Sequence, residues 1–293
     1  MSACGCPRRR RARLLREGAS LGLILHETGA PPRYKSGVTI PETGPGHPRA
    51  AFAPPAPPAG DRTLPRPAAL VKLAPIAPVP ELPLAPDRFR EEMHSLARRA
   101  ARDGGWGAGD GRAMRELFDE RAPTWNEGRG QAYLAPLRDA IDRGGVAPGR
   151  WCLEIGSGTG LQTPTLAAHF TRVAALDVAA EMLARAPRDA AARLRADASR
   201  LPVAAASIDA VVCVNAFLFP SEYVRVLRPG GCVVFVSTRG AATPIYLEPD
   251  EVASALAAAA TGPVEGVTSG IGASRWSVLR FAQPHLAAKG ARR

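Results

Sequence analysis

Short apolar runs alternate with helically spaced apolar residues along the second half of the chain. The apolar runs, which lack polar alternation, are residues 151–155, 172–177, 210–215 and 232–237, with a brief one at 192–196. Segments with helical spacing lie between or after them, at residues 161–170, 179–186, 220–227 and 248–260. Runs without alternation are typical of strands buried on both faces, and regular exchange with helices indicates a parallel sheet.

The C-terminal pattern predicts a different pairing. Residues 263–270 and 274–281 read as two strands joined by a short glycine-containing turn, which predicts a hairpin. The fold class is therefore α/β: a doubly wound, mostly parallel, Rossmann-like sheet of seven strands with an antiparallel C-terminal hairpin. Helices precede this sheet, and a disordered N-terminal extension precedes the helices.

The first half of the chain divides at about residue 85. Residues 1–85 are rich in proline and arginine and lack periodicity, so we expect a disordered extension. Residues 86–293 are expected to form one domain, with a helical cap over 86–145 and a core over 150–282. In the cap, apolar spacing predicts a helix over 87–102, then a loop and a second helix starting near residue 111, which Pro123 should interrupt.

Charge changes this picture little. The net charge is +11, but residues 1–85 hold 12 Lys/Arg against 5 Asp/Glu, so the remainder carries only +4. A mildly basic body is weak support for nucleic acid binding. No apolar run approaches the roughly 20 residues that span a bilayer, and the basic N-terminus lacks a signal-peptide core. We expect no membrane span, and a soluble, cytoplasmic protein.

The candidate chemistry begins at residues 151–161, where a strand runs into a glycine-rich turn. Gly156, Gly158 and Gly160 allow a ligand to lie against the backbone. The spacing is G-x-G-x-G, whereas dinucleotide-binding proteins use G-x-G-x-x-G. Glu154 precedes the turn, where it would repel a pyrophosphate and suit a positive group such as an ammonium. A nicotinamide oxidoreductase is therefore the weakest alternative.

Polar residues end the other predicted strands as well. Asp177, Asp197 and Asn215 each close a strand, and Glu154 closes the first. The carboxyl ends of parallel strands share one edge of the sheet, so these four side chains could touch a single nucleoside. Asp177 lies 21 residues after Gly156, near the offset expected for a carboxylate that accepts from ribose hydroxyls.

Several stretches together resemble a known family. They are Leu153-Glu-Ile-Gly-Ser-Gly-Thr-Gly160, Ala175-Leu-Asp-Val-Ala-Ala-Glu-Met-Leu183, Ala196-Asp-Ala-Ser-Arg-Leu-Pro202, Ser207-Ile-Asp-Ala-Val-Val212, Val226-Leu-Arg-Pro-Gly-Gly231 and the preceding Phe118-Asp-Glu-Arg-Ala-Pro-Thr-Trp125. Residues 110–282 resemble the class I S-adenosylmethionine-dependent methyltransferases of the type-11 group, related to ubiquinone and menaquinone methyltransferases and similar to an actinobacterial-type subgroup. The resemblance implies a methyltransferase with S-adenosylmethionine as cofactor.

The resemblance also implies which residues hold the amino-acid part of the cofactor. Glu154 would bind its amino group, directly or through water. Gly156, Ser157 and Gly158 would pass beneath it, in the turn that Gly160 completes.

For the nucleoside part, the resemblance implies five contacts. Asp177 would bind the ribose hydroxyls, and Val178 and Met182 would pack on adenine. Asp197 would accept from the adenine amino group, while the Ala198 N–H would donate to a ring nitrogen.

The sequence does not identify the methyl acceptor. The resemblance implies that Asn215 lies near the methyl group, but Phe217 and Leu218 do not complete an N-P-P-Y-type motif. We identify no catalytic base and no metal-binding motif, so the choice among O-, N- and C-methylation stays open, as does the oligomeric state. A small-molecule acceptor is the leading hypothesis. The alternatives are an RNA-associated methyltransferase guided by basic residues 8–16, and a non-catalytic S-adenosylmethionine-binding protein.

Overall fold

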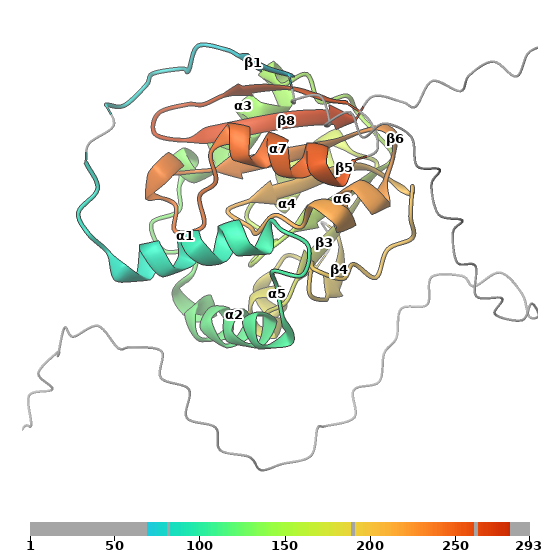
Figure 1. Cartoon of the computed structure of the whole chain (residues 1–293). Helices are drawn as coiled ribbons and strands as arrows, with labels where there is room; N and C mark the ends of the chain where they lie inside the picture. The colour runs from blue at the N-terminus through green and yellow to red at the C-terminus, as the bar shows by residue number, and fades with distance from the viewer. Residues whose placement is uncertain (1–68, 81–82, 189–190, 261–262, 282–293) are drawn as a thin grey trace, which may run out of the picture. The chain divides into compact units, whose positions relative to one another are not determined.

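The computed structural model describes residues 69–80, 83–188, 191–260 and 263–281, all within one unit, residues 60–293. Its elements in chain order are β1 (Ala69–Lys72), α1 (Arg88–Ala100), α2 (Ala108–Arg121), η1 (Ala122–Thr124), α3 (Gln131–Arg143), β2 (Trp151–Ile155), α4 (Thr163–His169), β3 (Arg172–Asp177), α5 (Ala180–Arg185), β4 (Ala192–Arg195), β5 (Ile208–Val214), α6 (Pro220–Val226), β6 (Leu227–Ser237), η2 (Gly240–Ala242), α7 (Pro249–Ala259), β7 (Val264–Ser269) and β8 (Arg275–Phe281) (Figure 1). Every strand and helix predicted after residue 150 is present. Within the described ranges, no helix has the length and apolarity needed to cross a bilayer.

The strands form one sheet in the order β1-β7-β8-β6-β5-β2-β3-β4. The five strands β4, β3, β2, β5 and β6 pair in parallel, whereas β8 runs antiparallel to both β6 and β7. The doubly wound, mostly parallel sheet with an antiparallel C-terminal hairpin is thus confirmed.

The strand β1 corrects the expected count of seven strands, because it adds an eighth. It pairs in parallel with β7, although its residues lie inside the segment predicted to be a disordered extension. The cause is that pairing with a sheet edge uses backbone N–H and C=O groups, so it needs no hydrophobic alternation. Three of the four β1 residues are exposed, so the sequence carries no hydrophobic pattern that would predict this strand. Residues 1–68 and 81–82 of the predicted extension lie outside the described residues.

Two helical layers cover the sheet (Figure 1). Leu153 and Ile155 of β2 join a core with apolar residues of α1, α6 and α7, whereas Cys152, which directly precedes Leu153, joins a core with residues of α3 and α4. Successive side chains of a strand point to opposite faces, so a strand covered on both sides is apolar at consecutive positions. This explains the unalternated runs in the sequence.

The cap helices follow the prediction except at one boundary. Pro123 ends α2 and lies in the 3₁₀ turn η1, as its ring and missing N–H require. The helix α2 begins at Ala108 rather than near residue 111. The side chain of Asp110 accepts a hydrogen bond from the Gly107 N–H (2.9 Å) and pairs with Arg99, so the glycine-rich loop itself supplies a helix start.

The order in which the chain adds strands to the sheet reverses between β2 and β5. From β2 the chain proceeds to β3 and β4 on one side, and from β5 it proceeds to β6 on the other. Crossover connections diverge at such a point and leave a crevice at the carboxyl ends of the two strands, where open α/β sheets bind ligands.

Asp139 provides a test of how the cap is attached to the sheet. This buried carboxylate of α3 accepts hydrogen bonds from Trp276 Nε1 of β8 (2.6 Å) and from Arg143 (3.3 Å). We expect Asp139→Ala to lower the free energy of unfolding by about 1–3 kcal/mol, since it leaves the buried indole N–H unpaired. Urea denaturation measures this. Asp142→Ala, an exposed change on the same helix, is the control and should cost less than about 0.5 kcal/mol; equal losses for the two variants would contradict the assignment.

Candidate functional site

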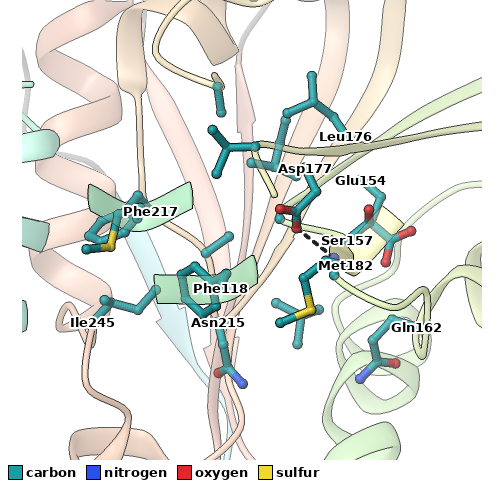
Figure 2. A pocket seen from close by; sticks show the side chains of 18 of the residues that line it. Phe118, Glu154, Ser157, Gln162, Leu176, Asp177, Met182, Asn215, Phe217 and Ile245 are labelled. Atoms are coloured by element: carbon teal, nitrogen blue, oxygen red, sulfur yellow. Dashed lines mark hydrogen bonds between the residues drawn. The ribbon is translucent and has the colours of Figure 1, made fainter. Parts of the chain in front are cut away.

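A cavity opens at the carboxyl ends of β2, β3 and β5, in the crevice where the strand order reverses. It encloses about 930 Å³, including the part open to solvent, and Figure 2 shows side chains that line it. Ten of the eleven sequence-predicted cofactor residues line it: Glu154, Gly156, Ser157, Gly158, Asp177, Val178, Met182, Asp197, Ala198 and Asn215. The eleventh, Gly160, lies in the same turn but is not among the lining residues.

The glycine turn adopts a backbone that other residues rarely do. Gly156, Gly158 and Gly160 have φ values of 64°, 55° and 75°. A Cβ on Gly156 would also lie 2.8 Å from the Cβ of Ala216, at the end of β5. Left-handed backbone and close approach both require glycine here, so the turn is compact and exposes its backbone to the cavity.

Glu154 is buried at the end of β2, and its carboxylate accepts a hydrogen bond from Thr163 Oγ1 (2.6 Å) at the start of α4. Burial raises the pKa of Glu154 to about 7; the Thr163 bond opposes this rise, and the negative charge of Asp177 adds to it. A cation next to this carboxylate would favour its ionised form. The site therefore suits a positively charged ligand group.

Asp177 connects the end of β3 to the glycine turn. Its carboxylate accepts hydrogen bonds from the backbone N–H groups of Gly158 and Ala179, both at 2.8 Å, the first of which is dashed in Figure 2. Burial raises the pKa of Asp177, while these backbone bonds lower it in part. Since each carboxylate oxygen has a second lone pair, the side chain can still accept from ligand hydroxyls.

Asp197 connects the end of β4 to the cap. Its carboxylate accepts from Trp106 Nε1 (3.0 Å) and from the Ser199 N–H (2.9 Å). Gly111 of α2 lies so close to this carboxylate that any side chain there would collide with it. The Trp106 loop, which the sequence predicted only as a connection, is therefore part of the cavity wall.

Asn215 follows β5 with a φ of 51°, in the left-handed region. Its side-chain amide donates to Thr238 Oγ1 (2.8 Å) and accepts from the Thr238 N–H (2.9 Å). These paired bonds hold a backbone conformation that costs on the order of 1–3 kcal/mol. The amide is thus held in a defined place between β5 and the end of β6.

Sequence reasoning assigned no role to several further lining residues, among them Tyr133 and Gln162, and it included Trp125 only through the resemblance of residues 118–125. Trp125 lies over the glycine turn, since a Cβ on Gly158 would be 3.4 Å from its Nε1. Gln162 donates from Nε2 to the Tyr133 carbonyl (2.7 Å), which joins the cap to the turn. The concentration of aromatic residues over 118–133 was the available signal for two of them, but their contact with the turn depends on how the cap folds back.

Two buried oxygens at this cavity have no hydrogen-bond partner within the described ranges, namely Ser157 Oγ and Gln162 Oε1. Both residues line the cavity wall, and Figure 2 labels both among the lining side chains. An unpaired buried polar atom costs about 1–3 kcal/mol, so such atoms are rare unless a ligand completes them.

A second cavity adjoins the first. It shares Phe118, Trp125, Tyr133, Asn215 and Ile245 with the first cavity and extends between the cap and the segment after β6. A molecule in the second cavity would therefore lie next to one in the first.

Comparison with known proteins identifies the domain. Residues 153–235 match a family model described as a methyltransferase domain, so this part of the chain carries a methyltransferase domain. The biotin biosynthesis bifunctional protein BioHC of Cellvibrio japonicus is 38% identical over 106 residues, which cover 33% of this chain and 21% of that protein.

Solved structures give more distant likenesses. The DhpI–SAH complex is 23% identical and covers 60% of this chain and 99% of its own, with a TM-score of 0.48. A methyltransferase from Aquifex aeolicus is 17% identical and covers 55% of this chain and 97% of its own, with a TM-score of 0.46. Both TM-scores lie below 0.5, so the identification rests on the sequence match.

The raised pKa of Glu154 predicts how stability depends on pH. Between pH about 4.5 and 7 the native carboxyl binds a proton that the unfolded one has lost, so this group makes stability fall as pH rises. Glu154→Gln keeps an acceptor for Thr163 and should stabilise the ligand-free protein by about 3 kcal/mol at pH 8 but only about 1 kcal/mol at pH 5. Denaturant titrations at both pH values measure this. Exposed Glu116→Gln is the control, and a pH-independent effect of Glu154→Gln would contradict the assignment.

Proposed function

We propose that the protein transfers a methyl group from S-adenosylmethionine, bound in the first cavity, to a small molecule bound in the second. The observation that carries this proposal is the pair of unpartnered buried oxygens, Ser157 Oγ and Gln162 Oε1, beside a buried carboxylate at a glycine turn. Donors and a cation from a ligand would satisfy all three groups. S-adenosylmethionine carries an ammonium, ribose hydroxyls and a sulfonium, so the residues present fit it.

Each wall of the first cavity suits one part of this cofactor. Glu154 would bind the ammonium, because a cation there removes the cost of its burial. Asp177 would accept from the ribose hydroxyls with its remaining lone pairs, and Met182 would pack on the adenine. Asp197, held by Trp106, would accept from the adenine amino group.

When bound, S-adenosylmethionine supplies a methyl group that bonds to an acceptor lone pair while the C–S bonding electrons remain on sulfur as a thioether. The protein's contribution is to align the two molecules and exclude water. Trp125, Phe118 and Ile245 give both cavities apolar walls. Burial raises the pKa of Tyr133, which keeps its phenol protonated and able to donate a hydrogen bond near Asn215. No His or Lys lines either cavity among the described residues, so we assign no side-chain base of these types.

A small molecule is favoured over RNA because the acceptor space is a walled cavity, closed on one side by the cap. The basic residues 8–16, which the RNA alternative needs, lie outside the described residues. Formation of S-adenosylhomocysteine in the presence of an acceptor would separate a transferase from a protein that only binds the cofactor.

Cofactor binding is the first test. Isothermal titration with S-adenosylhomocysteine should show binding, and Asp177→Asn should weaken it about 10- to 100-fold, because a hydrogen bond to a charged acceptor contributes about 1.5–3 kcal/mol. Exposed Asp142→Asn is the matched control and should leave the affinity unchanged. The proposal fails if the wild-type chain shows no heat of binding at millimolar ligand.

Because the Ser157 hydroxyl has no partner within the described ranges, its removal should affect stability and cofactor affinity differently. Ser157→Ala should leave the melting temperature of the ligand-free protein unchanged or higher, yet weaken S-adenosylhomocysteine about 2- to 10-fold. Ser277→Ala removes a buried hydroxyl that donates to Thr268 Oγ1 (3.3 Å), so this control should lose stability and keep the affinity. Calorimetry and titration together measure both. If Ser157→Ala behaves like the control, the hydroxyl has a structural role.

A further inference from the structure

We propose that the acceptor carries an oxyanion, a carboxylate or a phosphate, and that Arg129 binds it in the second cavity. This inference rests on the proposed function and specifies its substrate class. It follows from the way charge is divided between the two adjoining cavities.

The first cavity carries only negative formal charge. Its acidic side chains are those of Glu154, Asp177 and Asp197, and neither Arg nor Lys is among its lining residues in the described part of the chain. Such a cavity attracts a cationic ligand.

The lining of the second cavity carries a net positive formal charge. Arg121, Arg129 and Arg239 line it, against a single acidic residue, Glu127. None of the three guanidinium groups has an ion pair within the described ranges. A cavity of this sign draws in an anion and disfavours a cation.

Arg129 is the most constrained of these cations. Its guanidinium lies 3.8 Å from the centroid of the Trp125 ring and 5.8 Å from that of Tyr133, and the residue is half-buried. Among the described residues this guanidinium has neither a carboxylate partner nor a hydrogen bond. Burial lowers the pKa of Arg129, which reflects the cost of removing water from an unpaired charge. A planar guanidinium held by stacking can donate hydrogen bonds to two oxygens of an oxyanion ligand at once.

The other lining residues of the second cavity indicate what the remainder of the acceptor molecule is like. Phe89, Met93, Leu117 and Pro244 provide apolar surface, and Tyr133 and Asn215 lie where the two cavities meet. An acceptor with an apolar body and one oxyanion would place its charge on Arg129 and its body along this wall. The competing role for Arg129 is to bind the carboxylate of the cofactor itself. Its absence from the lining of the first cavity argues against that role.

The test uses the full chain saturated with S-adenosylhomocysteine and measures probe binding by isothermal titration. Naphthoate and naphthyl phosphate are the anionic probes, and naphthamide is the neutral one of the same shape. We expect both anions, or one of them, to bind more tightly than naphthamide, and their relative affinity distinguishes carboxylate from phosphate. Arg129→Gln should weaken the preferred anion about tenfold or more while changing naphthamide less than about twofold.

Two variants serve as controls. Arg129→Lys keeps the charge but not the planar fork and should fall between wild type and Arg129→Gln. Arg112→Gln removes an exposed arginine of the cap that lines neither cavity, and it should bind every probe as wild type does. The affinity for S-adenosylhomocysteine, measured for each variant, reports whether the first cavity is intact.

Three results would overturn the inference. Equal affinity of wild type and Arg129→Gln for the anionic probes removes Arg129 from acceptor binding. If Arg129→Gln weakens S-adenosylhomocysteine about tenfold but not methylthioadenosine, which lacks the amino-acid part, then Arg129 holds the cofactor's carboxylate. Failure of the wild-type chain to bind S-adenosylhomocysteine refutes the proposed function, and this outcome is distinct from the first two, in which the cofactor binds.

Discussion

The hydrogen bond from the Gly158 N–H to the Asp177 carboxylate is the contact on which the cavity depends. It holds the turn after β2 against the end of β3, at 2.8 Å and out of contact with solvent. The turn can come this close only because Gly156 and Gly158 adopt left-handed backbone without a Cβ. With the turn in this place, its backbone and the Asp177 carboxylate face the same space.

Features that lower the stability of the folded protein are concentrated around the first cavity. Glu154 is a buried acid with a raised pKa, Asn215 has a left-handed backbone, and the Ser157 and Gln162 oxygens have no partner within the described ranges. Each lowers stability by an amount on the order of 1–3 kcal/mol. In the rest of the described part of the chain, buried side-chain polar atoms are paired, as Asp139 is with Trp276. Local instability that a ligand could relieve is typical of a binding site.

The cap turns the crevice of the sheet into two cavities of opposite charge. Trp106 donates a hydrogen bond to Asp197, and Trp125 lies close to both the glycine turn and the Arg129 guanidinium. Trp125 is therefore one of the five residues that border both the acidic cavity and the basic one. Because opposite charges attract, this division favours a cationic ligand in the first cavity and an anionic ligand in the second.

The sequence alone determined the sheet and the residues at the ends of its strands. Unalternated apolar runs report burial on both faces, and strand-end residues such as Asp177 converge because parallel strands end at one edge. It did not predict β1, because pairing at an edge uses backbone groups that every residue has. Nor did it predict that Arg129 stacks on Trp125, or that this guanidinium has no carboxylate partner within the described ranges. Those depend on how the cap packs across the sheet, and only tertiary structure brings residues so distant in the chain together.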